Sequence, residues 1–167
     1  CVMLSGETAS GKYPTEALKT MVDTAVAAEG AIDYWGRFRE SALLPGVSSI
    51  SDAITHSCCL TAMDLGASAI LAATKTGYTA KVISRFRPGC PIIAVCQSEK
   101  TRRQLAISWG VHPLLTGEVD STDRLFSMTV DVARKEGVVQ PGETVVITAG
   151  VPIGKSGTTN LIKAQVV

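Results

Sequence analysis

The sequence predicts an α/β fold: a three-layer domain with a mostly parallel sheet and an antiparallel terminal edge strand. Beyond residue 50, short apolar runs of strand length alternate with stretches of helical period, joined by short loops. This alternation is typical of βαβ units, in which helices cover both faces of a parallel sheet. The last two apolar runs are joined by a polar, glycine-rich loop with no helical stretch, so the final strand should run antiparallel to its neighbour.

Local signals predict each element in turn. Cys1 to Leu4 has the character of the end of a buried strand, and Pro14 marks the first turn of a helix that ends at Gly30. Residues 31–50 show no clean period and are expected to be a connector. Later helices are predicted over 51–66, 80–86, 98–105 and, from Asp120 or Ser121, to 137; strands are predicted over 68–73, 91–95, 111–115, 143–148 and 160–167.

Composition narrows the class of protein. The chain has 167 residues, of which 46% are hydrophobic and 19% charged, with a formal net charge of +1. This balance favours a folded domain over disorder, and the absence of any Lys/Arg run argues against a nucleic-acid binder. The apolar runs are too short to cross a membrane. Five cysteines with no C-x-x-C pair suggest neither a disulfide framework nor a zinc site, which favours a reducing, cytoplasmic compartment.

Two segments approach the phosphate-binding P-loop pattern G-x-x-x-x-G-K-[ST]. The first, 6–13, has Tyr13 in the place of the hydroxyl residue that holds magnesium. The second, 150–156, is one residue too short between its glycines, and a strand is expected after it where a P-loop needs a helix. A P-loop-like nucleotide hydrolase is therefore kept only as an alternative.

The best candidate site is an anion site where one strand feeds a helix. Residues 74–79 offer three threonine hydroxyls, a lysine and a glycine at a helix N-terminus, where side-chain O–H groups, backbone N–H groups and the helix dipole can converge on a phosphate. The loop 149–159 leaves its strand at the same sheet edge, so that Lys155, Ser156, Thr158 and Thr159 can close over a ligand. The alternative is that both segments are ordinary solvated turns. His56 and His112 have no partner at a diagnostic spacing, and no complete active site is predicted.

Several of these segments resemble pyruvate kinase, over nearly the whole chain and in the family's order. The stretch 2–9, with Gly11-Lys12-Tyr13-Pro14 and Glu16-Ala17, resembles the last strand, loop and helix of that enzyme's TIM barrel. Thr74-Lys75-Thr76-Gly77, the segments 84–88 and 91–95, and the loop 150–160 look like its C-terminal domain.

The resemblance implies a division of the chain and a parent activity. Residues 1–30 would be a remnant of the barrel, 31–50 a connector and 51–167 the C-terminal allosteric domain. The parent enzyme would transfer a phosphoryl group from phosphoenolpyruvate to ADP, giving pyruvate and ATP, with Mg²⁺ and K⁺. Its catalytic and metal-binding residues would lie before Cys1. The sequence does not begin with methionine, and a preceding segment of the parent protein is expected. The barrel-mouth remnant Ser5, Gly6 and Glu7 would be all that remains of the catalytic neighbourhood, so no catalytic residue set is complete and the fragment should be inactive.

The resemblance also implies regulation. Thr74, Lys75, Thr76, Gly77 and Thr79 would bind the phosphate of an effector, and a loop with Gly154, Lys155, Ser156, Gly157 and Thr158 would cover it. The residues 151–155 look bacterial, which leaves fructose 1,6-bisphosphate, a sugar monophosphate and AMP open as effectors. The family is a homotetramer, and a dimer is an option for the fragment. A third class of function is a purely structural dimerisation domain. Without the rest of the barrel, Leu4, Leu18 and Met21 are expected to form exposed or rearranged apolar surface.

Overall fold

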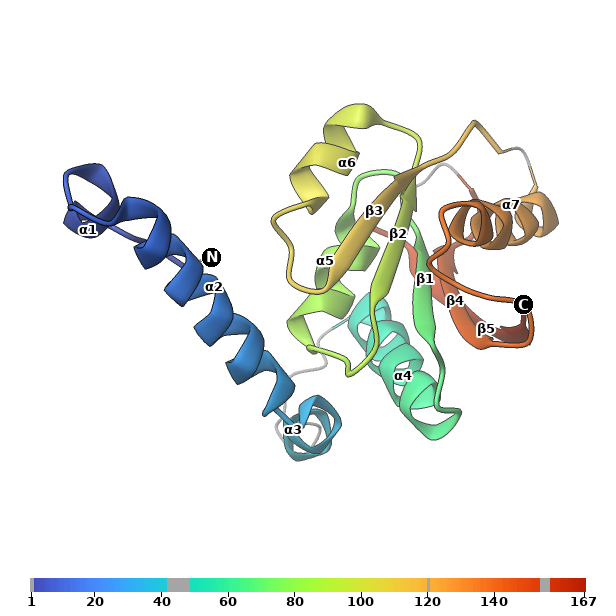
Figure 1. Cartoon of the computed structure of the whole chain (residues 1–167). Helices are drawn as coiled ribbons and strands as arrows, with labels where there is room; N and C mark the ends of the chain where they lie inside the picture. Colours follow the sequence, from blue (N-terminus) through green and yellow to red (C-terminus); the bar gives the residue numbers. More distant parts are fainter. Residues whose placement is uncertain (1, 42–48, 120, 154–156) are drawn as a thin grey trace. The chain divides into compact units, whose positions relative to one another are not determined.

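A computed structural model describes residues 2–41, 49–119, 121–153 and 157–167 (Figure 1). It contains two compact units, Cys1–Asp33 and Tyr34–Val167. The elements are α1 (Gly6–Ala9), α2 (Pro14–Gly30), α3 (Tyr34–Ser41), α4 (Ile50–Asp64), β1 (Ala69–Ala73), α5 (Tyr78–Arg85), β2 (Ile92–Cys96), α6 (Glu99–Leu105), β3 (Val111–Leu115), α7 (Thr122–Lys135), β4 (Thr144–Gly150) and β5 (Thr159–Val166).

The first unit is one long helix preceded by a single helical turn. Helix α2 has Pro14 in its first turn, where a missing N–H costs nothing, and ends at Gly30 as the sequence predicts. The structure assigns no strand to residues 2–5, which differs from the strand expected there, because a strand needs a partner and none of the described residues pairs with this segment. Val2, Met3 and Leu18 are more than half exposed, in line with the expected apolar surface, whereas Leu4 and Met21 are partly buried.

A five-stranded sheet of order β3-β2-β1-β4-β5 organises the second unit. β1 pairs in parallel with β2 and β4, β2 pairs in parallel with β3, and β5 alone runs antiparallel, beside β4. The predicted fold class is therefore confirmed. Every residue of β1 and β2 is buried, because helices cover both faces of the sheet and leave no face for alternating polar side chains.

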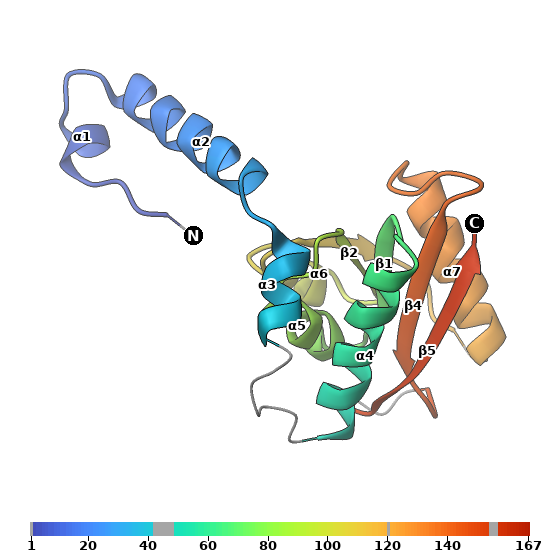
Figure 2. The same cartoon turned by 90° about the horizontal axis from the view of Figure 1, so that it is seen from below.

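The two faces of the sheet carry separate hydrophobic cores. Ile70 and Ala72 of β1 pack on one face with side chains from α3, α4, α5 and α6, while Ala69 and Leu71 pack on the other with α7. Figure 2 shows α4 and α7 on opposite sides of the β-sheet. The three layers arise because successive side chains of a strand point to opposite faces.

Helix α3 lies within the segment that the sequence assigned to a connector. Its Phe38 is 1% exposed and belongs to the first core. The ring of Phe38 lies 5.1 Å from that of His56 in α4 and 6.2 Å from that of Phe86, which follows α5. Within the segment predicted as a connector, residues 34–41 form a helix with a buried aromatic anchor, which the sequence did not predict; residues 42–48 lie outside the described part.

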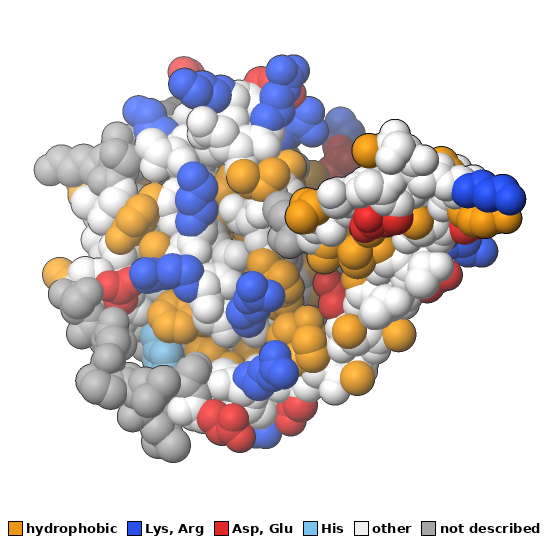
Figure 3. Space-filling view, turned by 90° about the vertical axis from the view of Figure 1, so that its left-hand side faces the viewer, with side chains coloured by type: hydrophobic (Ala, Val, Ile, Leu, Met, Phe, Trp, Pro, Cys, Tyr) orange, Lys and Arg blue, Asp and Glu red, His pale blue; other side chains and the backbone are white. Residues whose placement is uncertain are grey.

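Figure 3 shows Lys and Arg side chains interspersed with apolar, polar and acidic groups on this surface. On α6, Arg102 and Arg103 both donate to Glu99, with N–O distances of 2.8 and 2.9 Å. These hydrogen bonds lower the pKa of Glu99 to about 2.

Among the described residues, no helix is both long and apolar enough to span a membrane.

Candidate functional site

The site lies at the carboxyl ends of the parallel strands, beside the central strand β1. The chain leaves β1 toward β2 on one side, whereas β4 lies on its other side, so the loops after β1 and β4 diverge and leave a crevice. The cavity in this crevice has a volume of about 400 Å³. Its described lining is Ala73, Thr74, Lys75, Thr76, Tyr78, Thr79, Val95, Gln97, Thr116, Glu118, Val119, Leu125, Gly150, Ile153, Gly157, Thr158 and Thr159.

The turn between β1 and α5 forms one wall of the cavity and is held by backbone geometry. The backbone N–H of Gly77 donates to the Thr74 hydroxyl at 3.0 Å, and Gly77 has a φ of +83°, a conformation that favours glycine. A Cβ at Gly77 would also approach Leu105 Cδ2 to 3.0 Å. Because of this turn, α5 begins at the cavity, with the N–H groups of its first turn unused by the helix itself.

The predicted phosphate-binding side chains in this wall differ in their exposure to solvent. Lys75 and Thr76 are exposed and line the cavity. Thr79 is buried, and its hydroxyl lies 2.7 Å from the hydroxyl of Thr159 at the start of β5. One of these two hydroxyls donates to the other, and the acceptor keeps its own proton for a further hydrogen bond. The turn and the strand after the loop are thus joined at the cavity floor.

The loop between β4 and β5 forms the opposite wall. Asn160 closes its base: its side-chain oxygen accepts from the Val151 N–H at 2.9 Å, and its amide nitrogen donates to the Val151 carbonyl at 2.6 Å. A Cβ at Gly150 would lie 2.9 Å from the Thr158 carbonyl oxygen, so the two ends of the loop approach closely. Gly157 and Thr158 line the cavity, whereas Gly154, Lys155 and Ser156 lie outside the described residues.

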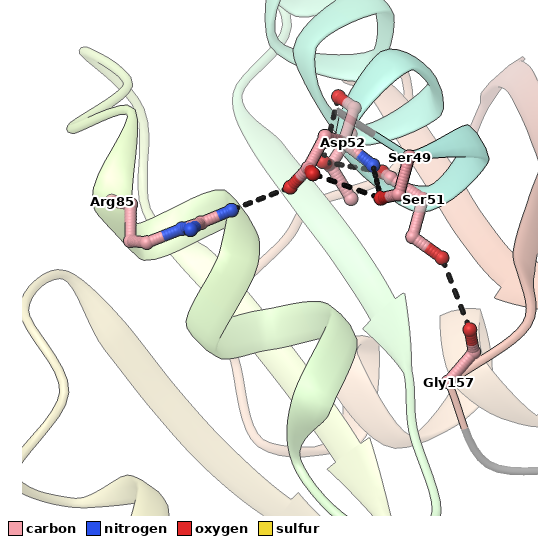
Figure 4. Close-up of polar contacts among 6 residues, drawn as sticks. Ser49, Ser51, Asp52, Arg85 and Gly157 are labelled. Carbon is pink, nitrogen blue, oxygen red and sulfur yellow. Dashed lines mark hydrogen bonds and ion pairs between the residues drawn. The ribbon is translucent and has the colours of Figure 1, made fainter. Parts of the chain in front are cut away.

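A polar cluster at the start of α4 holds this loop from outside (Figure 4). The hydroxyl of Ser51, which is 5% exposed, donates to the Gly157 carbonyl at 3.1 Å. The next residue, Asp52, accepts from Arg85 at the end of α5 at 2.6 Å and from the Ser49 hydroxyl at 2.8 Å. Ser49 also caps α4 by accepting from the Asp52 N–H. The N-terminus of α4 therefore contacts both the loop and α5.

Replacing Ser51 by alanine should loosen the end of this loop. Loss of a buried hydroxyl donor worth about 1 kcal/mol should raise the amide exchange rate of residues 157–159 about fivefold. Hydrogen exchange followed by mass spectrometry measures this rate. The matched control is Ser57→Ala on the exposed face of the same helix. Equal exchange in the two variants would show that Ser51 does not restrain the loop.

The described residues form neither a P-loop nor a group of metal ligands. The segment 150–156, which approaches a P-loop pattern, is followed by β5 and not by a helix, and part of the segment 6–13 is itself helix α1. Mg²⁺ takes carboxylate oxygens as ligands, and no three Asp, Glu, His or Cys side chains among the described residues meet in a group that could hold a metal ion. Glu7 is fully exposed, and backbone N–H groups of Glu7 and Ser5 lower its pKa.

Cys58, Cys59, Cys90 and Cys96 lie in or against the core, and the partly buried ring of His56 packs beside it. Burial raises the pKa of Cys58 to about 12 and that of Cys90 to about 11, so both thiols are protonated at neutral pH and are poor nucleophiles. The His56 ring lies between Phe38 and Phe86, and its Nε2 has no hydrogen-bond partner among the described residues. Burial thus explains these side chains without a catalytic role.

The sequence did not indicate a third part of the cavity lining, which comes from the segments after β2 and β3 and from α7. Gln97 follows β2, Glu118 follows β3, and Leu125 lies in the first turns of α7. None of them belongs to a motif. Gln97 and Glu118 come shortly after predicted strands, whose carboxyl ends share one edge of the sheet, whereas Leu125 lies within the helix predicted to end at residue 137.

Known proteins resemble this chain along nearly its whole length. A pyruvate kinase of Clostridium acetobutylicum is 49% identical over 166 residues, which is 99% of this chain and 35% of the relative, and one of Staphylococcus epidermidis is 48% identical over 99% of this chain and 28% of the relative. The crystal structure of a pyruvate kinase from Cryptosporidium parvum matches with a TM-score of 0.84 and 31% identity, over 99% of this chain and 32% of that one. The chain thus spans about a third of the length of these relatives.

The family comparison agrees with the order of the elements and with the resemblance noted from the sequence. The pyruvate kinase alpha/beta domain matches residues 52–165, which include α5, the strands β1–β4 and nearly all of β5. On these grounds the chain belongs to the pyruvate kinase family and carries that family's alpha/beta domain.

Proposed function

We propose that this chain is the effector-binding, regulatory part of a pyruvate kinase. The observation that supports the proposal best is the cavity at the N-terminus of α5, where Thr74, Lys75 and Thr76 border one wall and the loop ending at Thr158 borders the other. Backbone N–H groups at a helix N-terminus favour an anion, and Lys75 adds a full positive charge. Such an arrangement suits the phosphate group of a small molecule.

The role proposed for the whole enzyme is that of its relatives. It would transfer a phosphoryl group from phosphoenolpyruvate to ADP, yielding pyruvate and ATP in the cytoplasm, with Mg²⁺ and K⁺ bound by parts of the enzyme outside this chain. Residues 1–30 would belong to the catalytic barrel, with Ser5, Gly6 and Glu7 at its mouth, and residues 51–167 to the allosteric domain. In a homotetramer, an effector that prefers one state would change the affinity for phosphoenolpyruvate.

Calorimetric titration of the purified chain tests effector binding. Ribose 5-phosphate, fructose 1,6-bisphosphate and AMP are each titrated into the chain, and at least one should bind with one site per chain. Lys75→Gln should weaken that binding, whereas Lys135→Gln, which removes a charge at the far end of α7, should not. If no compound binds, the chain is not an effector domain and a purely structural role in association is favoured.

The isolated chain should not catalyse the parent reaction. With phosphoenolpyruvate, ADP, Mg²⁺ and K⁺ present, we expect pyruvate formation no faster than in a protein-free control, because the described residues bring together no metal-binding carboxylates. A lactate dehydrogenase-coupled assay measures pyruvate directly. Pyruvate formation that scales with the concentration of the chain would contradict the proposal, and Mg²⁺-dependent ATP hydrolysis would favour the P-loop alternative.

A further inference from the structure

The first turn of α4 points two neighbouring side chains in different directions (Figure 4). The hydroxyl of Ser51 donates to the Gly157 carbonyl, at the end of the loop that borders the cavity. The carboxylate of Asp52 accepts instead from Nη2 of Arg85, in the last turn of α5, at 2.6 Å. One helical turn therefore joins the end of the loop to the C-terminus of α5.

Both oxygens of the Asp52 carboxylate have donors. Oδ1 accepts from Arg85, and Oδ2 accepts from the Ser49 hydroxyl at 2.8 Å. The side chain of Asp52 is 12% exposed, whereas that of Arg85 is 64% exposed. A carboxylate with so little access to water needs its donors, because an unpaired charge is costly in such a place. Arg85 thus holds Asp52, and with it the first turn of α4, in one orientation.

The two charges also suit the helix ends that carry them. Asp52 lies in the first turn of α4, where free N–H groups favour negative charge. Arg85 lies in the last turn of α5, where free carbonyl groups favour positive charge. These dipole interactions explain each residue by itself, but they do not require the two side chains to meet. The ion pair is a separate feature that connects two helices.

A second contact joins the same part of the loop to the other end of α5. The hydroxyl of Thr159, two residues after Gly157, lies 2.7 Å from that of Thr79 at the start of α5. Along the helix axis, Thr79 and Arg85 are about 9 Å apart. The segment 157–159 is therefore held to both ends of one helix, directly at the N-terminus and through α4 at the C-terminus.

We propose that Arg85 is a positioning residue for the effector site. Acting through Asp52 and Ser51, it holds residues 157–159 in place; these residues line the cavity, whereas Arg85 is not part of its described lining. This inference rests on the proposed function, because it assigns a means of regulation to the same site. Separating Arg85 from Asp52 releases the end of the loop and lowers the affinity for the phosphate ligand. By linkage, a ligand bound against 157–159 stabilises the ion pair in turn.

Hydrogen exchange of the free chain tests this link without a ligand. Arg85→Gln should raise the amide exchange rate of residues 157–159 about threefold. Arg85→Lys keeps a charged donor and should stay close to the unaltered chain. Lys81→Gln is the control, because it removes an exposed positive charge from the same helix and Lys81 forms no ion pair with a described residue. Exchange in Arg85→Gln no faster than in Lys81→Gln would overturn the inference.

The double variant Ser51→Ala/Arg85→Gln tests the route of the effect. If Arg85 acts through Ser51, its loss should change little once the Ser51 hydroxyl is gone, so the double variant should exchange about as fast as Ser51→Ala alone. Multiplied effects, about fifteenfold in total, would show that Arg85 acts by general destabilisation and would overturn the proposed route. Thermal unfolding of each variant checks that its fold is preserved.

Calorimetric titration with ribose 5-phosphate separates this inference from the proposed function. Arg85→Gln should bind about threefold more weakly than the unaltered chain, because the ligand must then restore the position of 157–159, and Arg85→Lys should bind nearly as well. Equal affinity in the unaltered chain and Arg85→Gln would overturn the role of Arg85 and leave effector binding intact. If the unaltered chain binds neither ribose 5-phosphate, fructose 1,6-bisphosphate nor AMP, the proposed function is overturned, whereas a threefold exchange effect would still establish the link between Arg85 and 157–159.

Discussion

Replacing Thr76 by glutamate should weaken the binding of phosphate compounds at least about 100-fold, or ~3 kcal/mol. Thr76 is exposed, lines the cavity and lies two residues before α5. A carboxylate there would compete for the N–H groups of the first helical turn and repel a phosphate within a few ångströms. The helix itself should tolerate the change, since negative charge near an N-terminus is favourable. Calorimetric titration with ribose 5-phosphate measures the loss.

The control for Thr76→Glu is a variant that introduces a glutamate outside the cavity. Ser127→Glu places it on the exposed surface of α7, outside the cavity lining. Thr76→Glu and Ser127→Glu should unfold at similar temperatures, and Ser127→Glu alone should retain affinity. Retained binding in Thr76→Glu would place the phosphate elsewhere.

Truncating Phe38 to alanine should destabilise the second unit by about 3–5 kcal/mol. Phe38 is 1% exposed, and its ring contacts Trp35, His56 and Phe86, with ring centroids 6.0, 5.1 and 6.2 Å away. The alanine variant would lose these contacts and leave a cavity in the core. Urea unfolding followed by circular dichroism gives the free energy.

Arg39→Ala is the matched control for Phe38→Ala. Arg39 lies next to Phe38 on α3 but is exposed, so its loss should cost less than about 0.5 kcal/mol. If both variants unfold at the same urea concentration, α3 does not contribute to the core, and the sequence-based prediction of a connector would describe residues 34–41 better than the structure does.

The strands could be predicted because burial on both faces leaves a clear signal. β1 and β2 are short, apolar runs bounded by polar turns, and the predicted limits differ from the observed ones by a residue or so. Helix α3 could not be predicted in this way. It has eight residues, mostly polar, and Phe38 is its only buried side chain among those described, too few for a helical period to emerge.

The candidate site likewise has a part that the sequence predicts and a part that it does not. The wall formed by Thr74–Gly77 could be found from sequence, since hydroxyls, a lysine and a glycine are consecutive at a strand-to-helix turn. Pairing of Thr79 with Thr159 could not, because it joins residues 80 positions apart. Nor could the position of Gln97 and Glu118 in the cavity lining be predicted from their neighbours, since strand order alone brings the loops after β2 and β3 to this cavity.

The central claim is that a phosphate binds at the N-terminus of α5, and amide chemical shifts of the ¹⁵N-labelled chain test it most directly. Adding ribose 5-phosphate should shift the resonances of Thr76, Gly77, Tyr78 and Thr79 most, with smaller changes at Gly157 and Thr158. Inorganic sulfate at equal concentration serves as the control for a non-specific anion and should shift them less. Unchanged resonances at 76–79 under saturating ribose 5-phosphate, fructose 6-phosphate and AMP would contradict the claim.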